Sequence, residues 1–137
     1  MFYTHSIRPF LRFLPFQFGK GRLAHYILQP GEIPSQLVRT KSGVVVRTRQ
    51  DKMYRDIYLY GEYEQSLTTC IKNIVKPNFL CLDIGANFGY YSVLLASLVK
   101  GQARVHSFEP VPFIHELTQE TIKKNGVEEC VVLNILL

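Results

Sequence analysis

The fold of this chain is decided by the stretch Leu82-Asp83-Ile84-Gly85-Ala86-Asn87-Phe88-Gly89-Tyr90-Tyr91-Ser92. Its first residues end an apolar run over residues 79–84, whose length suits a buried parallel strand. Gly85 and Gly89 bracket a turn where the backbone can bend sharply and approach a ligand. Residues 88–99 continue as an apolar helix, and residues 103–108 form a second strand followed by the acidic Glu109. This order of strand, glycine loop, helix, strand and acid predicts an α/β fold that holds a nucleotide-type cofactor.

Two classes of cofactor use this layout, and the glycine loop distinguishes them. The dinucleotide fingerprint Gly-x-Gly-x-x-Gly, counted from Gly85, would place its second and third glycines at Asn87 and Tyr90. A diphosphate needs those glycines for close approach, and the carboxylate of Asp83 repels it. The ammonium and sulfonium groups of S-adenosylmethionine suit a loop that is preceded by an aspartate. The loop therefore favours S-adenosylmethionine, and an NAD-type oxidoreductase is the disfavoured alternative.

Three motifs together resemble the FkbM-type methyltransferases. They are the stretch at residues 82–92, the segment Val105-His106-Ser107-Phe108-Glu109-Pro110-Val111-Pro112 and, as a weaker match, Ile122-Lys123-Lys124-Asn125-Gly126. The resemblance covers residues 61–137 and implies a Rossmann-like methyltransferase fold with S-adenosylmethionine as cofactor. It also implies O-methylation of a sugar or secondary-metabolite hydroxyl, so the expected partner is a small-molecule or glycan acceptor. Thr121 departs from the family pattern, which often has asparagine there.

The resemblance also assigns the cofactor-binding residues. The loop beside the methionine moiety would consist of Asp83, Gly85, Ala86, Asn87 and Gly89. Glu109 would accept hydrogen bonds from both ribose hydroxyls, which suits a charged acceptor. Glu64 would meet the methionine ammonium, although the helix dipole also explains a carboxylate in a first helical turn. The catalytic base is not identified, and no metal site is expected.

The chain divides into two predicted parts. Residues 1–60 are an N-terminal basic and aromatic extension, with a β-hairpin over residues 43–60 whose strands span 43–49 and 55–60. Residues 61–137 are the N-terminal part of the cofactor-binding domain, with further helices at 62–75 and 113–125 and a third strand from residue 131. We therefore expect a methyltransferase fold truncated after about three parallel strands. A non-catalytic cofactor-binding or interaction fragment is the alternative.

Charge is distributed unevenly between these parts. Residues 1–60 hold ten Lys and Arg against three Asp and Glu, whereas residues 61–137 hold six against eight. The basic residues are scattered and form no nucleic-acid motif, so we expect a solvated basic surface and no nucleic-acid partner. Weak peripheral membrane contact through the phenylalanine-rich residues 2–18 is the second interpretation. Because no apolar run reaches about 18 residues, no transmembrane helix is expected, and we predict a cytoplasmic protein.

Two further expectations concern the cysteines and the edge of the sheet. Cys70 and Cys81 lie in apolar stretches, which favours buried free thiols over metal ligands or disulfides. In the family's sheet order, the strand at 79–84 would lack a neighbour on one side. The apolar segment Phe79-Leu80-Cys81-Leu82 would then be an open edge through which the chain self-associates.

Overall fold

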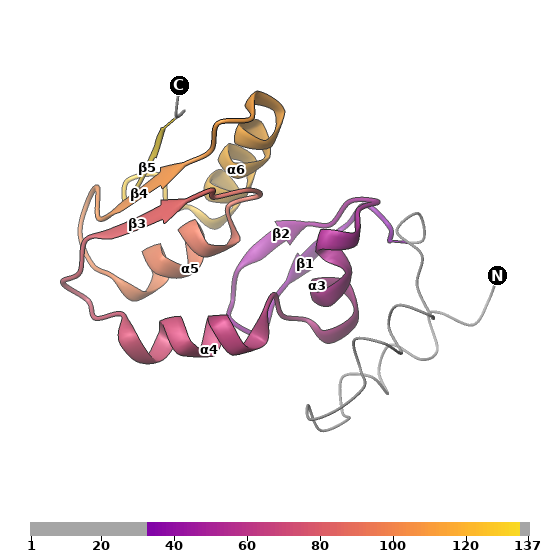
Figure 1. Cartoon of the computed structure of the whole chain (residues 1–137), viewed down its shortest axis with the longest axis horizontal. Helices are drawn as coiled ribbons and strands as arrows, with labels where there is room; N and C mark the ends of the chain where they lie inside the picture. The colour runs from indigo at the N-terminus through magenta and orange to yellow at the C-terminus, as the bar shows by residue number, and fades with distance from the viewer. Residues whose placement is uncertain (1–32, 135–137) are drawn as a thin grey trace.

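The computed structural model describes residues 33–134, and its centre is a sheet of three parallel strands (Figure 1). These are β3 (Cys81–Ile84), β4 (Val105–Phe108) and β5 (Val131–Asn134), in the order β3-β4-β5. Cys81 is in register with Val105, and Val105 with Val131. Each pair of strands is connected by a helix, as parallel strands require. The predicted α/β architecture with about three parallel strands is therefore confirmed.

The two connecting helices form one layer beside the sheet. Helix α5 (Tyr90–Leu98) contacts all three strands, and its apolar residues are buried on nearly every side. Helix α6 (Pro112–Asn125) packs against α5 and begins with a proline, whose missing N–H has no helical partner to lose there. It ends at Gly126 in the left-handed conformation, so the predicted C-cap is confirmed.

The N-terminal hairpin exists, but its predicted boundaries are wrong. Strand β1 (Leu37–Arg39) pairs antiparallel with β2 (Val45–Arg47), and residues 55–60, predicted as a strand, form helix α3 (Arg55–Tyr60). A short 3₁₀ turn, η2 (Lys52–Tyr54), leads into α3 after the side chain of Asp51 accepts a hydrogen bond from the Met53 N–H. Gly61 then ends α3 in the left-handed conformation. The isoleucine and the tyrosines of this segment favour a strand by propensity, but their burial in the core as a helix from Ile57 to Tyr60 outweighs that preference.

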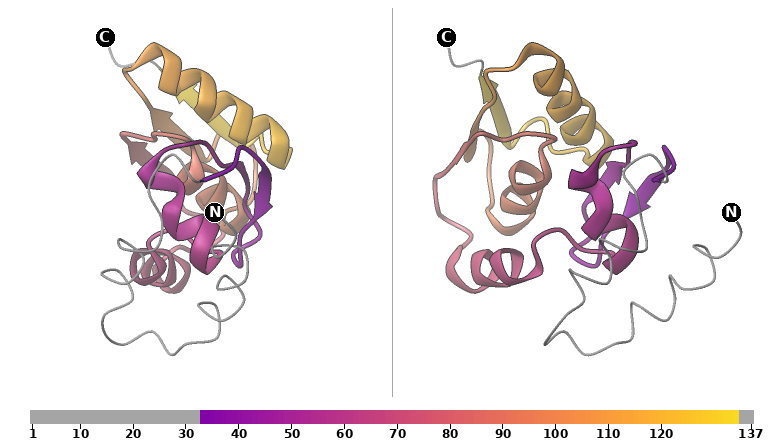
Figure 2. Two further views of the ribbon diagram at one scale, coloured as in Figure 1. Left: turned by 90° about the vertical axis from the view of Figure 1, so that its right-hand side faces the viewer. Right: turned by 45° about the vertical axis from the view of Figure 1, so that its right-hand side comes forward.

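The hairpin lies beside α6 (Figure 2), and side chains connect the two. The side-chain amide of Asn125 accepts from the Val45 N–H at 2.8 Å and donates to the Val45 carbonyl at 2.7 Å. It thus pairs with both backbone groups of Val45, as a residue of a neighbouring strand would. One turn earlier on α6, Glu120 accepts hydrogen bonds from Arg47 and Arg49 at 3.0 and 2.9 Å. The hairpin therefore packs on the predicted cofactor-binding part of the chain. Two of the basic residues of the N-terminal part, Arg47 and Arg49, form ion pairs there.

Helix α4 (Gln65–Ile74) is shorter than predicted and less buried. Ile71 and Val75 pack against the core, but the other apolar residues of the predicted face, Leu67, Cys70 and Ile74, are exposed. The expectation that Cys70 is buried is therefore wrong, because the helix turns its sulfur away from the core. Cys81 is buried as predicted, and both are free thiols.

One face and both edges of the three-stranded sheet remain open within the described residues. Leu82 and Ile84 point away from α5 and are 62% and 73% exposed, while Cys81, which points the other way, is buried. Strand β3 is one of the two edge strands in the described part of the chain, and β5 is the other. The membrane contact predicted for residues 2–18 lies outside the described residues. Among residues 33–134, no helix combines the length and apolar character that crossing a membrane requires.

Candidate cofactor site

The loop between β3 and α5 turns through three left-handed residues. Gly85, Asn87 and Gly89 have φ angles of 79°, 50° and 79°. The N–H groups of Gly85 and Ala86 donate to the Phe108 carbonyl at 2.9 and 3.0 Å, which ties the loop to the end of β4. Left-handed φ is unfavourable for any residue with a Cβ, so the two glycines permit the turn and Asn87 tolerates it.

The two glycines differ in what surrounds them. A Cβ built on Gly89 would lie 3.0 Å from Cγ2 of Thr118, because α6 approaches the loop closely at this point. A Cβ on Gly85 would meet nothing within 4 Å. Gly89 is therefore required by packing as well as by conformation, whereas Gly85 leaves open space beside the backbone.

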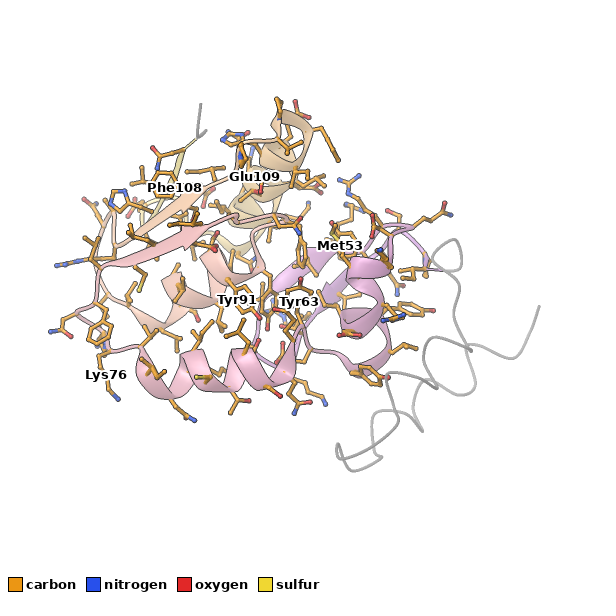
Figure 3. All side chains as sticks on the ribbon, viewed as in Figure 1. Met53, Tyr63, Lys76, Tyr91, Phe108 and Glu109 are labelled. Atoms are coloured by element: carbon orange, nitrogen blue, oxygen red, sulfur yellow. The ribbon has the colours of Figure 1, made fainter. Side chains whose placement is uncertain are left out.

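Glu109 lies at the end of β4 and braces the loop (Figure 3). Its carboxylate, only 4% exposed, accepts from the N–H of Asn87 at 2.9 Å and from the N–H of Val111 at 3.0 Å. A carboxylate offers about four acceptor positions. Two therefore remain for the predicted ribose hydroxyls, and ribose binding stays a prediction.

Three consecutive residues of the first turn of α5 each donate a side-chain hydroxyl to a carboxylate. Tyr90 donates to Glu62, Tyr91 donates to Glu64 at 2.8 Å, and Ser92 donates to Asp83 at 2.7 Å. The hydroxyl of Ser107 on β4 donates in turn to Ser92 at 2.9 Å. The start of α5 thus holds carboxylates from the segment before α4 and from β3 in fixed places around the loop.

Burial raises the pKa values of several of these side chains. It raises the pKa of Asp83, hydrogen bonds from Ser92 oppose that shift, and the nearby charge of Glu109 adds to it. Burial and, after it, the hydrogen bond to the Glu62 carboxylate together raise the pKa of Tyr90 to about 12. Burial raises the pKa of Tyr91 in the same way, with Glu64 contributing. Both phenols therefore remain protonated donors at neutral pH.

Glu64 is placed beside an aromatic cluster. It has a left-handed φ of 38° and begins α4 without a side-chain cap hydrogen bond, so its carboxylate turns to Tyr91 instead of capping the helix. Figure 3 shows Tyr63 and Tyr91 side by side, with ring centroids 5.8 Å apart. Tyr63 also contacts the rings of Phe88 and Tyr90. The geometry links Glu64 to the start of α5, and its contact with an ammonium group stays a prediction.

The chemistry of the loop fits a ligand with cationic donor groups. The side-chain oxygen Oδ1 of Asn87 is buried and has no hydrogen-bond partner within the described part of the chain. An acceptor without a partner is unfavourable and suits a ligand that brings an N–H or O–H. Asp83, Glu64 and Glu109 add negative charge nearby, which favours an ammonium or sulfonium group over a diphosphate. No cluster of His, Cys, Asp and Glu among residues 33–134 could hold a metal ion.

Sequence reasoning missed two residues of the site. Glu62 is buried among three donors, and Thr118 contacts both Asn87 and Gly89 from α6. Glu62 meets Tyr90 across 28 positions of sequence and Thr118 meets Asn87 across 31, so no local pattern indicates these contacts. Of the two tyrosines that follow Gly89, Tyr90 packs in the core and is 1% exposed.

The family model for protein-L-isoaspartate(D-aspartate) O-methyltransferase matches residues 47–135, well over half of the chain. The chain belongs to this family. A curated relative, the protein-L-isoaspartate O-methyltransferase of Aeropyrum pernix, is 41% identical over 51 residues. That alignment covers 37% of this chain and 20% of the relative, so the chain matches only about a fifth of that enzyme's length.

Two solved structures have similar folds. The S-adenosylmethionine-dependent O-methyltransferase of Thermotoga maritima has a TM-score of 0.51 and 20% identity, covering 76% of this chain and 41% of that one. The tRNA (uracil-54, C5)-methyltransferase of Pyrococcus abyssi, solved with S-adenosyl-L-homocysteine, has a TM-score of 0.54 and 16% identity. Its match covers 74% of this chain and 24% of that one. At these identities the likeness concerns the fold, and the predicted Rossmann-like methyltransferase fold is confirmed.

These findings refine the predicted family. The matched family is a methyltransferase family, as predicted, but it is a different one from the FkbM-type proteins. The FkbM-type assignment is not supported by this match and stays a prediction. So does the absence of a nucleic-acid partner.

Proposed function

We propose that this chain binds S-adenosylmethionine and forms the cofactor-holding part of an O-methyltransferase. The observation that carries the proposal is the loop after β3, which has the carboxylates of Asp83 and Glu109 nearby and, at its centre, an Asn87 Oδ1 without a hydrogen-bond partner among the described residues. Membership of the isoaspartate methyltransferase family supports the same cofactor. The proposed ligand and the local charge agree, because both the ammonium and the sulfonium are cationic.

Each site residue has a distinct proposed role. Glu109 accepts from the ribose hydroxyls with the acceptor positions that Asn87 and Val111 leave free. Glu64 and Asp83 face the amino-acid end and attract its ammonium. When bound, the sulfonium supplies an electrophilic methyl group, so the protein's task is positioning more than acid–base chemistry.

The acceptor is proposed to be an oxygen atom. Family membership supports a carboxylate acceptor, which needs no base to lose a proton. The resemblance to FkbM-type proteins supports a hydroxyl of a sugar or secondary metabolite, which does need one. We favour the carboxylate, because the family model matches well over half of the chain.

Calorimetry on the full chain tests the cofactor proposal. S-adenosylmethionine and S-adenosylhomocysteine should bind, and NAD should not. Methylthioadenosine lacks the amino-acid end, so it should bind at least about tenfold more weakly if the acidic residues attract the ammonium, equivalent to about 1.4 kcal/mol. Failure of both S-adenosyl ligands to bind would refute the proposal.

Transfer of a labelled methyl group separates the two versions of the function. Incorporation into an isoaspartyl peptide, but not into its aspartyl isomer, would support the carboxylate acceptor. Cofactor binding without transfer to any acceptor would favour the alternative, a non-catalytic cofactor-binding chain.

A further inference from the structure

We infer that Thr118 on α6 is a positioning residue that holds the cofactor loop in its binding conformation. This role rests on the proposed function, since it concerns the same loop. It adds a residue that lies 29 positions after Gly89 in the sequence and belongs to another helix.

Thr118 contacts the loop through both branches of its side chain. Its hydroxyl donates to the carbonyl of Asn87, and the carbonyl of Ile114, one turn back on α6, lies 3.0 Å from the same oxygen. Its methyl group lies where Gly89 leaves room, 3.0 Å from the place a Cβ would occupy. The side chain is fully buried, so water does not compete for these contacts.

These contacts help to fix the backbone conformation of Asn87. Its N–H donates to Glu109 and its carbonyl accepts from Thr118, so the residue is held from both sides while its φ is 50°. Left-handed backbone is unfavourable for a residue with a Cβ and persists where surrounding contacts determine it. With both backbone groups engaged, the side-chain Oδ1 has no partner among residues 33–134, which suits a ligand that brings a donor. Pre-organisation of this kind strengthens binding, because less freedom is lost when the ligand arrives.

Thr121 provides a matched control on the same helix. It is also buried, and its hydroxyl likewise donates to the carbonyl four residues earlier on the helix, that of Leu117, at 3.0 Å. Within the described part of the chain, its side chain makes no hydrogen bond to the loop at residues 85–89. Replacing each threonine by valine removes the same hydroxyl at two buried places, and only one of them touches Asn87.

The experiment uses the full chain with Thr118→Val, Thr118→Ser and Thr121→Val. Binding of S-adenosylmethionine is measured by calorimetry, and hydrogen exchange of a peptide spanning residues 85–92 is measured without cofactor. Thr118→Val should bind about tenfold more weakly and exchange faster in this peptide, because the Asn87 carbonyl loses its buried donor. Thr118→Ser keeps the hydroxyl, so its affinity for S-adenosylmethionine should stay within about threefold of that of the unaltered chain. Thr121→Val should bind the cofactor and exchange in this peptide as the unaltered chain does.

The outcomes separate this inference from the proposed function. If the unaltered chain binds no cofactor, the proposed function fails, while loop exchange still tests Thr118. Exchange in Thr118→Val no faster than in Thr121→Val would overturn the positioning role, as would equal affinity of these two variants for the cofactor. If Thr118→Val does not fold, Thr118→Ala removes the hydroxyl without adding bulk, and the same comparison of exchange decides.

Discussion

The hydroxyl of Tyr90 donates a hydrogen bond to the carboxylate of Glu62 inside the core. Ser42, in the turn between β1 and β2, donates to the other carboxylate oxygen at 2.5 Å. Tyr90 is the first residue of α5, directly after Gly89. Movement of the hairpin would therefore disturb the residue that ends the loop.

Tyr90→Phe should destabilise the chain by about 1–3 kcal/mol, because the buried Glu62 carboxylate loses a donor. Tyr91→Phe is the matched control, since its hydroxyl donates to the exposed Glu64 and its loss should change stability by less than about 0.5 kcal/mol. Urea unfolding of both variants measures the difference. Equal stability of the two would mean that the Tyr90–Glu62 contact contributes nothing beyond a surface hydrogen bond.

Glu109→Ala should weaken S-adenosylmethionine binding by at least about tenfold, because hydrogen bonds to a charged acceptor contribute about 1.5–3 kcal/mol each. Since Glu109 also braces Asn87, reduced affinity alone does not identify a ribose contact. Adenosine and 2′-deoxyadenosine separate the two roles in a calorimetric comparison. The unaltered chain should prefer adenosine and Glu109→Ala should not; a preserved preference would remove Glu109 from the ribose site.

Gly85→Val should abolish cofactor binding, because a branched side chain would fill the open space beside the loop and is unfavourable at a φ of 79°. Gly43→Val is the control, since Gly43 has a φ of 89° and also has nothing within 4 Å of a built Cβ. Both variants should lose about 1–2 kcal/mol of stability from the left-handed backbone. Only Gly85→Val should lose binding in a calorimetric titration, and normal binding by that variant would show that ligand does not approach Gly85.

The open side of the sheet should make the chain self-associate. Strand β3 is an edge strand of the described sheet, and unpaired backbone groups beside Leu82 and Ile84 can pair with another chain. Light scattering after size exclusion should find oligomers, which Leu82→Lys should reduce. Phe113→Lys is the control, because Phe113 is 65% exposed and belongs to α6 and not to a strand. A monomer at all concentrations would contradict this prediction.

The cofactor-binding half of the fold was predictable because its signals are local. The strand, the two loop glycines and the apolar helix follow one another within about twenty residues, and the C-cap at Gly126 follows from its own dipeptide. Such patterns depend on neighbours in the sequence, which are neighbours in space as well. The N-terminal half was less predictable. Residues 55–60 combine β-forming side chains with helix caps at Asp51 and Gly61, and only the packing of Ile57 to Tyr60 in the core decides between them.

By itself, the sequence determined the α/β class, the positions of the glycine turn and the acidic residue after β4, and the preference against a dinucleotide. Tertiary structure alone decided which polar groups meet. Glu62 reaches Tyr90 across 28 positions, and Thr118 reaches Asn87 across 31. Glu109 was predicted to face a ligand, and folding also turned it toward the loop backbone. The physical reason is that a buried hydrogen bond depends on the places where helices and strands pack, and those places are set by the whole core and by no short segment of the chain.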